Sequence, residues 1–164
     1  MIFVTVGTHE QQFNRLIEYI DKMKESGKIE DEVVMQIGYC TYEPKYCKWD
    51  KLIPYSQMEK NVKEARIVIT HGGPATFIMP LHLGKTPIVV PRQHAFDEHV
   101  NDHQVEFSQE VSKRMGTIIP VIDINELEHI ILNYDAIVAT RNTGMTSNNS
   151  RFNEEFEKIV DSLF

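Results

Sequence analysis

"IFVTVGTHEQQFNRLIEYIDKM", residues 2–23, carries the pattern that determines the architecture of this chain. Its first five residues form a β-rich run that stops at Gly7. Apolar residues then recur at helical spacing, namely Phe13, Leu16, Ile17, Ile20 and Met23. The polar residues among and directly after them are expected to face solvent, namely Glu18, Asp21, Lys22 and Lys24. The stretch predicts a strand, a tight loop and an amphipathic helix.

The same unit recurs along the chain. Apolar runs at residues 33–37, 67–70, 87–91 and 117–122 predict further strands. Helical patterns are expected over residues 56–65, after Pro74, from Asp97 to about Met115, and over residues 124–134, whereas residues 38–51 read as irregular. Continuous apolar strands that alternate with helices favour a parallel sheet covered on both faces. The predicted fold class is therefore α/β and Rossmann-like.

Composition limits the class of protein. With 164 residues the chain can bury one core but not two ordinary ones, and its formal charge of -7 repels nucleic acid. No apolar run approaches the roughly 20 residues that a membrane span requires, which favours a cytoplasmic protein. Cys40 and Cys47 lack CxxC spacing and are expected to be reduced thiols.

A composition change marks a boundary near residue 140. Residues 1–139 form the predicted Rossmann-like domain, and residues 140–164 form a polar linker and a C-terminal helix. One side of that helix carries an apolar stripe, made of Phe152, Phe156, Ile159, Val160 and Leu163. The stripe can dock on the chain's own sheet or on another domain or chain, and the sequence leaves both open.

Ligands of open parallel sheets bind beyond the carboxyl ends of the strands, so the loops there matter most. The first is "VGTHEQQF", in which Gly7 allows a tight turn. Thr8 and Gln11 have the spacing of a capping box, which would be purely structural. In the alternative interpretation, the amides at this helix start, together with His9, face an anionic group.

The second loop is "ITHGGPAT", residues 69–76. Gly72 and Gly73 allow the backbone to approach a ligand closely, and Pro74 suits the first position of a helix. The loop lacks both the lysine of a Walker motif and the spacing of GxGxxG. A plain strand-to-helix turn would explain the glycines but would not require His71.

The third loop lies in "VVPRQHAFDEHVNDHQVEF", residues 89–107. His99 and His103 are expected to share one helix face, and His94 lies upstream. HExxH is absent, which makes a zinc site a weaker interpretation than a sugar site. A solvated helix start is a further alternative, which we also consider weaker than a sugar site. Sugar hydroxyls both donate and accept, which suits a row of polar side chains, namely Glu98, His99, Asp102, His103 and Gln104.

Four segments together resemble one family. "FVTVGTHEQQFNRLI", "ARIVITHGGPATF", "LGKTPIVVPR" and "EHVNDHQVEF" are similar, in order and spacing, to the glycosyltransferase family 28 C-terminal domain, over about residues 1–135. The likeness is greatest to small stand-alone members, which act on dolichol-linked sugar or in bacterial capsule and exopolysaccharide synthesis. The resemblance implies the donor half of a GT-B enzyme, a UDP-sugar donor, inversion at the anomeric carbon, and no metal or other cofactor.

The resemblance also implies roles for individual residues. Gly7, Thr8 and His9 would line the diphosphate side, with His9 as the first candidate for the general base, and Tyr55 would lie near the uracil. The second nucleotide loop would comprise His71, Gly72, Gly73 and Thr76. The donor sugar would meet Glu98, His99, Asp102, His103 and Gln104. One departure is Met79, which stands where many relatives carry a ribose-binding glutamate.

The function implied by the resemblance is that of a catalytic subunit. It would transfer a hexose, with galactose favoured over N-acetylglucosamine, to a lipid-linked sugar acceptor. A separate membrane-anchored subunit would bring that acceptor and hold this chain at the inner face of the membrane. Two alternatives are a non-catalytic nucleotide-sugar-binding or regulatory subunit, and a metal hydrolase that uses His94, His99 and His103.

Overall fold

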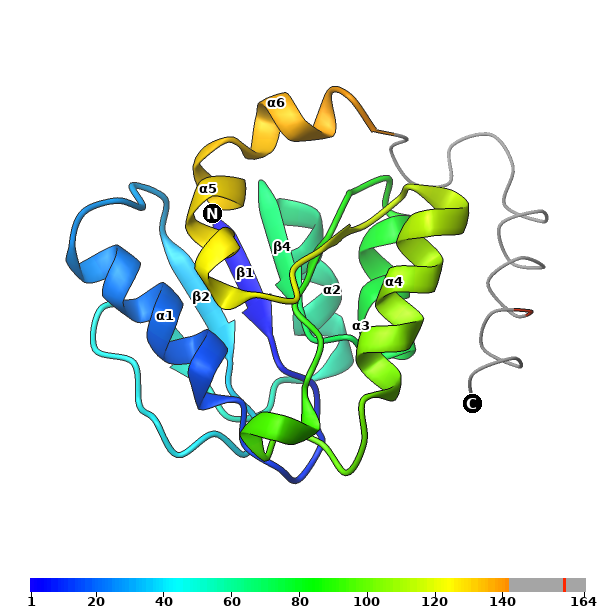
Figure 1. The fold of residues 1–164 in the computed structure, drawn as a ribbon. Helices are drawn as coiled ribbons and strands as arrows, with labels where there is room; N and C mark the ends of the chain where they lie inside the picture. Colours follow the sequence, from blue (N-terminus) through cyan, green and yellow to red (C-terminus); the bar gives the residue numbers. More distant parts are fainter. Residues whose placement is uncertain (142–157, 159–164) are drawn as a thin grey trace.

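The computed structural model describes residues 1–141 and Lys158. Its centre is one six-stranded sheet in which all pairings are parallel and the order is β3-β2-β1-β4-β5-β6 (Figure 1). The strands are β1 Ile2–Thr5, β2 Val33–Gln36, β3 Lys48–Asp50, β4 Ile67–Thr70, β5 Ile88–Val89 and β6 Ile119–Pro120. The predicted Rossmann-like α/β class is confirmed.

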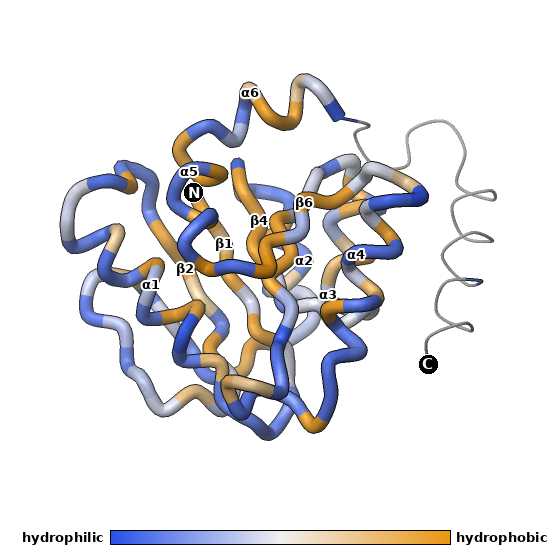
Figure 2. Tube along the Cα trace, in the orientation of Figure 1, coloured by the Kyte–Doolittle hydropathy of each residue, from blue (hydrophilic) through white to orange (hydrophobic). Residues whose placement is uncertain are grey.

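Helices cover both faces of the sheet. They are α1 Asn14–Glu25, α2 Tyr55–Glu64, α3 Pro74–His82, α4 His103–Met115, α5 Leu127–Leu132 and α6 Tyr134–Val138, with 3-10 turns η1 His94–Phe96 and η2 Ile124–Glu126. Alternate residues of β1 divide the core, because Ile2 and Val4 pack with α1 and α5 whereas Phe3 packs with α2. On the α2 side, Val89 joins the cluster of α3 and α4. Figure 2 shows the apolar strands enclosed between these helices.

Helix α1 buries the apolar stripe that its sequence predicts, since Leu16, Ile17 and Ile20 are fully buried. Asp21 was expected to face solvent, and this expectation is wrong. The Asp21 carboxylate is buried and accepts hydrogen bonds from the Tyr42 hydroxyl and from the backbone N–H groups of Lys45 and Tyr46. Asp21 on α1 thus holds the long segment between β2 and β3.

Two predicted boundaries are wrong. Residues 38–51 contain β3, an edge strand in which Lys48 and Asp50 are exposed and only Trp49 is half-buried, so that no apolar run marks it. The helix expected from Asp97 begins only at His103, because Asp97 adopts a left-handed conformation (φ 58°) that closes the preceding turn. His99 therefore lies in the loop and does not share a helix face with His103.

The described part of the chain contains no helix long and apolar enough to cross a membrane. Arg141 ends the continuous described segment and donates to the carbonyl oxygen of Ile118. The predicted C-terminal helix and its apolar stripe lie outside the described residues, apart from Lys158, and the boundary near residue 140 stays a prediction.

Candidate functional site

The strand order reverses between β1 and β4, and the loops that leave these two strands meet there. A Cβ added to Gly7, whose φ is +74°, would lie 2.3 Å from Nε2 of His71. A Cβ added to Gly73 would lie 2.3 Å from Cε1 of the same ring. His71 is thus enclosed by two glycines at the switch point, which is the place where this class of sheet binds ligands.

His71 makes polar contacts through both ring nitrogens. Nδ1 lies 3.2 Å from the backbone nitrogen of Gly73 and 3.4 Å from Oε1 of Gln104, and Nε2 lies 2.9 Å from the Thr76 hydroxyl. Burial lowers the pKa of His71 to about 3, and the charge of Arg92 acts in the same direction. His71 is therefore a neutral imidazole that shapes the glycine loop, rather than a cation.

Gln104 joins the loops after β4 and β5. Its side-chain oxygen accepts from the backbone N–H groups of Gly72 (3.1 Å) and Arg92 (3.0 Å). A Cβ on Gly72 would lie 2.9 Å from Cβ of Gln104, so only glycine fits against this side chain. The structure thus brings Gln104 to the glycine loop, where it is buried.

His9 and His99 stack on each other across two loops. Their ring centroids are 4.7 Å apart and the rings are inclined by 19°. Burial lowers the pKa of His99, and the nearby charges of His9 and Arg92 lower it further. His99 thus offers a neutral ring beneath His9 at the carboxyl edge of the sheet.

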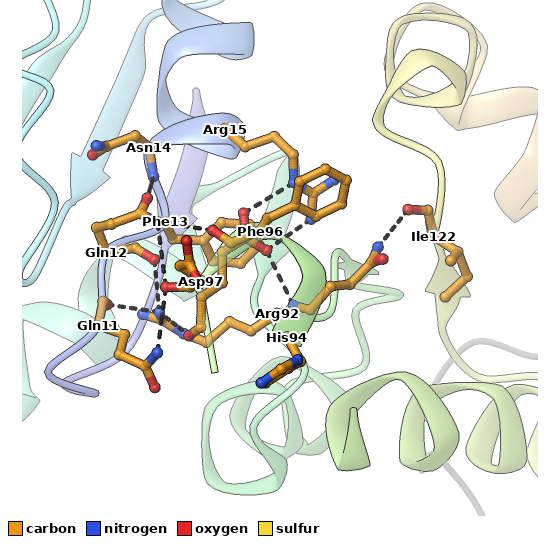
Figure 3. Close-up of polar contacts among 12 residues, drawn as sticks. Gln11, Gln12, Phe13, Asn14, Arg15, Arg92, His94, Phe96, Asp97 and Ile122 are labelled. Atoms are coloured by element: carbon orange, nitrogen blue, oxygen red, sulfur yellow. Dashed lines mark hydrogen bonds and ion pairs between the residues drawn. The ribbon is translucent and has the colours of Figure 1, made fainter. Parts of the chain in front are cut away.

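Arg92 is the largest fully buried side chain at this edge, and it connects the loop after β1 to the loop after β5 (Figure 3). Its Nη1 donates to the carbonyl oxygens of Gln11 (2.8 Å) and Glu98 (3.1 Å), and its Nη2 donates to that of Val6 (2.7 Å). Burial lowers the pKa of Arg92 to about 10, which leaves it charged at neutral pH. The site has a fixed positive charge beneath its loops.

Glu98 is fully buried and its carboxylate is already engaged. Nε of Arg15 lies 2.9 Å from Oε2, Nη2 of Arg15 lies 3.0 Å from Oε1, and the Gln93 backbone N–H also donates to Oε1. The guanidinium of Arg15 in turn lies 4.5 Å from the centre of the Phe96 ring. The structure therefore gives Glu98 a role in holding the loop to α1.

The remaining loop residues are more open. Thr8 and Asp102 are exposed, and Oδ1 of Asp102 accepts from the backbone N–H of His94. The backbone N–H of His103 donates to Oδ1 of Asn101 at the start of α4. The capping box expected of Thr8 is wrong, because α1 begins at Asn14, whose N–H is instead accepted by the side chain of Gln12.

A groove of about 340 Å³ lies between α2 and α3. Tyr55, at the start of α2 and 71% exposed, lines it together with Met79. Ala75 also lines the groove, one residue before Thr76, so the groove adjoins the glycine loop. Its one carboxylate belongs to Glu59, one turn after Tyr55. The structure thus unites the two positions that the resemblance assigns to uracil and ribose.

Metal-ligating side chains do not converge at this edge. Across residues 1–141 and Lys158, no group of three or more His, Cys, Asp or Glu side chains is arranged to hold a metal ion. His94, His99 and His103 of the hydrolase alternative are therefore not brought together as ligands.

Sequence reasoning missed the residues that hold the loops in place, namely Gln11 as a side-chain partner, Gln12, Arg15 and Arg92. One signal was present, because Arg92 directly follows the buried run of β5 and an arginine at such a position needs a buried partner. The partners of Arg92 are backbone carbonyl groups, which no side-chain pattern reveals.

Strand order, parallel pairing and a glycine loop at the switch point define the class as a Rossmann-like α/β domain. The sequence model of the glycosyltransferase family 28 C-terminal domain matches residues 1–163, and the chain belongs to this family. The match extends past the 135 residues in which the motifs resemble that family. The fold is that of the donor-binding half of a GT-B glycosyltransferase.

Two solved structures share the fold. One is the glycosyltransferase SnogD from Streptomyces nogalater, with a TM-score of 0.52 and 16% identity over 84% of this chain. The other is the glycotransferase of kitacinnamycin, with a TM-score of 0.51, 16% identity and the same coverage. The chain spans 37% and 36% of their lengths, respectively. The comparison with curated proteins gave no match.

Proposed function

We propose that this chain is the donor-binding, catalytic subunit of an inverting glycosyltransferase that uses a UDP-hexose. Galactose is the favoured donor sugar and N-acetylglucosamine the second candidate. The acceptor is a lipid-linked sugar of capsule or exopolysaccharide synthesis. The observation that carries the proposal is the cluster of Gly7, His71 and Gly73 at the switch point, above the buried charge of Arg92.

The diphosphate belongs at this cluster. Close approach of the backbone, the start of α3 at Pro74 and the buried guanidinium of Arg92 all favour a dianionic group. These groups can also stabilise the charge that develops on the departing UDP, which supports metal-independent transfer. The uridine would then lie in the groove of Tyr55 and Met79, with the ribose hydroxyls beside Glu59.

The sugar would extend toward the loop after β5. His99, Asp102 and His103 offer polar groups there, whereas Glu98 and Gln104 act by holding the loop. In the reaction, the acceptor oxygen bonds to the anomeric carbon while the bond to UDP breaks. The electron pair of that bond leaves on the diphosphate, and the acceptor proton passes to a base, for which His9 is the candidate.

A partner is part of the proposal. A GT-B cleft has two walls, and this chain supplies the donor wall. We place the acceptor wall on a membrane-anchored subunit that recruits the chain from the cytoplasm to the inner face of the membrane. Met79 favours a second candidate, a nucleotide-sugar-binding subunit without catalysis, because a thioether cannot accept the two hydrogen bonds that a carboxylate can.

A transfer assay tests the proposal. The chain is co-expressed with a candidate membrane-anchored acceptor subunit, and membranes are supplied with radiolabelled UDP-galactose and a lipid-linked glucose. Label in the lipid fraction that requires both proteins supports the catalytic subunit. Binding of UDP by calorimetry without transfer of any UDP-hexose supports the second candidate, and the absence of both would contradict the proposal.

A further inference from the structure

The side chain of Gln11 connects His9 to the loop after β5. Nε2 of Gln11 donates to the carbonyl oxygen of Asp97 at 3.3 Å, and this bond fixes which end of the amide is which. The opposite end, Oε1, lies 2.9 Å from Nε2 of His9. Because an amide oxygen only accepts, Nε2 of His9 must carry the proton.

The carbonyl group that orients Gln11 belongs to Asp97, whose backbone conformation is unusual. Asp97 is the one non-glycine residue with a positive φ among residues 1–141 and Lys158, and this conformation ends the η1 turn. Its carbonyl oxygen also lies 3.4 Å from Nε2 of Gln12, and the Gln11 backbone is fixed from the other side by Arg92 (Figure 3). Backbone strain of this kind often accompanies a functional site.

The second nitrogen of His9 has a different environment. Within the part of the chain that the structure describes, Nδ1 has no hydrogen-bond partner, and the stacked ring of His99 fixes the plane of the imidazole. His99 accepts from the backbone N–H of Asn101 through its own Nδ1, so its orientation is also determined. The His9 ring is therefore held on one edge and one face, while its Nδ1 edge is left for a ligand.

We propose that Gln11 is a positioning residue that keeps the proton of His9 on Nε2 and thereby presents Nδ1 as the proton acceptor for the attacking hydroxyl. This inference rests on the proposed transferase function. In the step, the hydroxyl proton passes to Nδ1, the oxygen bonds to the anomeric carbon, and UDP leaves with the electron pair. His9 then returns the proton to solvent. The arrangement repeats the logic of a base oriented by a third group.

The tautomer can be measured without any substrate. In protein with nitrogen-15 histidine, the His9 signals are expected to show a protonated Nε2 and an unprotonated Nδ1 near pH 8. Gln11→Ala should give a mixture of tautomers, whereas Gln11→Glu, which keeps an acceptor, should retain the wild-type pattern. Gln12→Ala is the control for general loosening of the loop, because it removes bonds to the carbonyl groups of Asp97 and Phe96 and to the Asn14 N–H, while the bond between Gln11 and His9 stays. The His71 signals report whether each variant is folded.

Transfer from UDP-galactose in the presence of the membrane partner provides the second readout. Gln11→Ala is expected to lower kcat about tenfold or more, with KM for UDP-galactose within about twofold of wild type, since positioning a base affects the chemical step. A protonated Nδ1 in the wild type, or an unchanged His9 spectrum in Gln11→Ala, would overturn the inference. If UDP does not bind while the tautomer results hold, the proposed function fails and the orientation of His9 stands.

Discussion

Gly7 and Gly27 have nearly the same backbone conformation but different surroundings. Their φ angles are +74° and +81°, and a Cβ at Gly27 would meet nothing within 4 Å. Gly27→Ala should therefore cost only the strain of a left-handed residue, about 1–2 kcal/mol. Gly7→Ala adds a clash with the His71 ring and should lower the free energy of unfolding by more, as measured in urea. Equal losses of unfolding free energy in the two variants would show that Gly7 is not packed against His71 as described.

The histidine between the glycines predicts an acid-sensitive stability. Burial lowers the folded-state pKa of His71 from 6.5 to about 3, so its contribution is complete above pH 6.5 and is lost as the pH falls toward 3. The limiting slope for one proton is about 1.4 kcal/mol per pH unit. His71→Gln should reduce the slope of unfolding free energy between pH 6.5 and 5. An unchanged slope would indicate that His71 is protonated in the folded state.

His99 provides the comparison for this titration. Burial also lowers its pKa, so His99→Gln should change the slope in the same direction. The effect should be smaller than that of His71→Gln, since His99 is half-buried. Below pH 4, Asp21 enters as well, because its hydrogen bonds from Tyr42, Lys45 and Tyr46 outweigh burial and lower its pKa below 3.8. The histidine effects are therefore read above pH 5.

Secondary-structure elements with regular apolar patterns could be predicted from the sequence. The run of β1 and the stripe of α1 are continuous and buried, and Pro74 starts α3 as expected. The edge strand β3 was missed because it is paired on one side only and stays partly exposed. The start of α4 was misplaced because the left-handed residue Asp97 ends one turn, and the turn-favouring residues Asn101 and Asp102 then precede the helix.

In the groove between α2 and α3, we predict that Glu59 on α2, across from Met79 on α3, contacts the nucleotide. Glu59→Gln removes the carboxylate that we place beside the ribose, and Glu59 already lies 3.3 Å from Lys63. Because the side chain is 43% exposed, we expect a loss of about 1 kcal/mol, or about fivefold in the Kd of UDP. Calorimetry with UDP measures it.

Two controls accompany this substitution. Glu64→Gln changes an exposed carboxylate at the end of α2 that does not line the groove, and it should leave the Kd unchanged. The loss in Glu59→Gln should also be smaller for 2′-deoxy-UDP, which lacks one of the two hydroxyls. If Glu59→Gln weakens both nucleotides equally, the carboxylate acts on charge rather than on ribose.

Over the whole chain, the fold class and the three ligand loops followed from local patterns, but the contacts among the loops did not. Val6, Gln11 and Glu98 offer Arg92 their backbone carbonyl groups, and these groups are identical in every residue. The enclosure of His71 by Gly7 and Gly73 depends on the pairing of β1 with β4, which only the tertiary fold specifies. Side-chain chemistry drew attention to polar residues of these loops, but it did not reveal that Glu98 and Gln104 are buried whereas Thr8 and Asp102 are exposed.

The two edges of the sheet offer a direct comparison. The amino edge carries its own groove of about 520 Å³, lined by residues of both charges that include Lys28, Asp31 and Arg66. Under the proposed function we expect a nucleotide at the carboxyl edge, because the topological switch point and the glycine loop lie there.

Backbone-amide NMR during a titration with UDP tests this assignment most directly. We expect the largest shifts at Gly7–His9, at Tyr55, and from Gly72 to Met79, with smaller ones from Arg92 to Gln104. Shifts that gather instead around Lys28, Asp31 and Arg66, or no shift at millimolar UDP, would contradict the account.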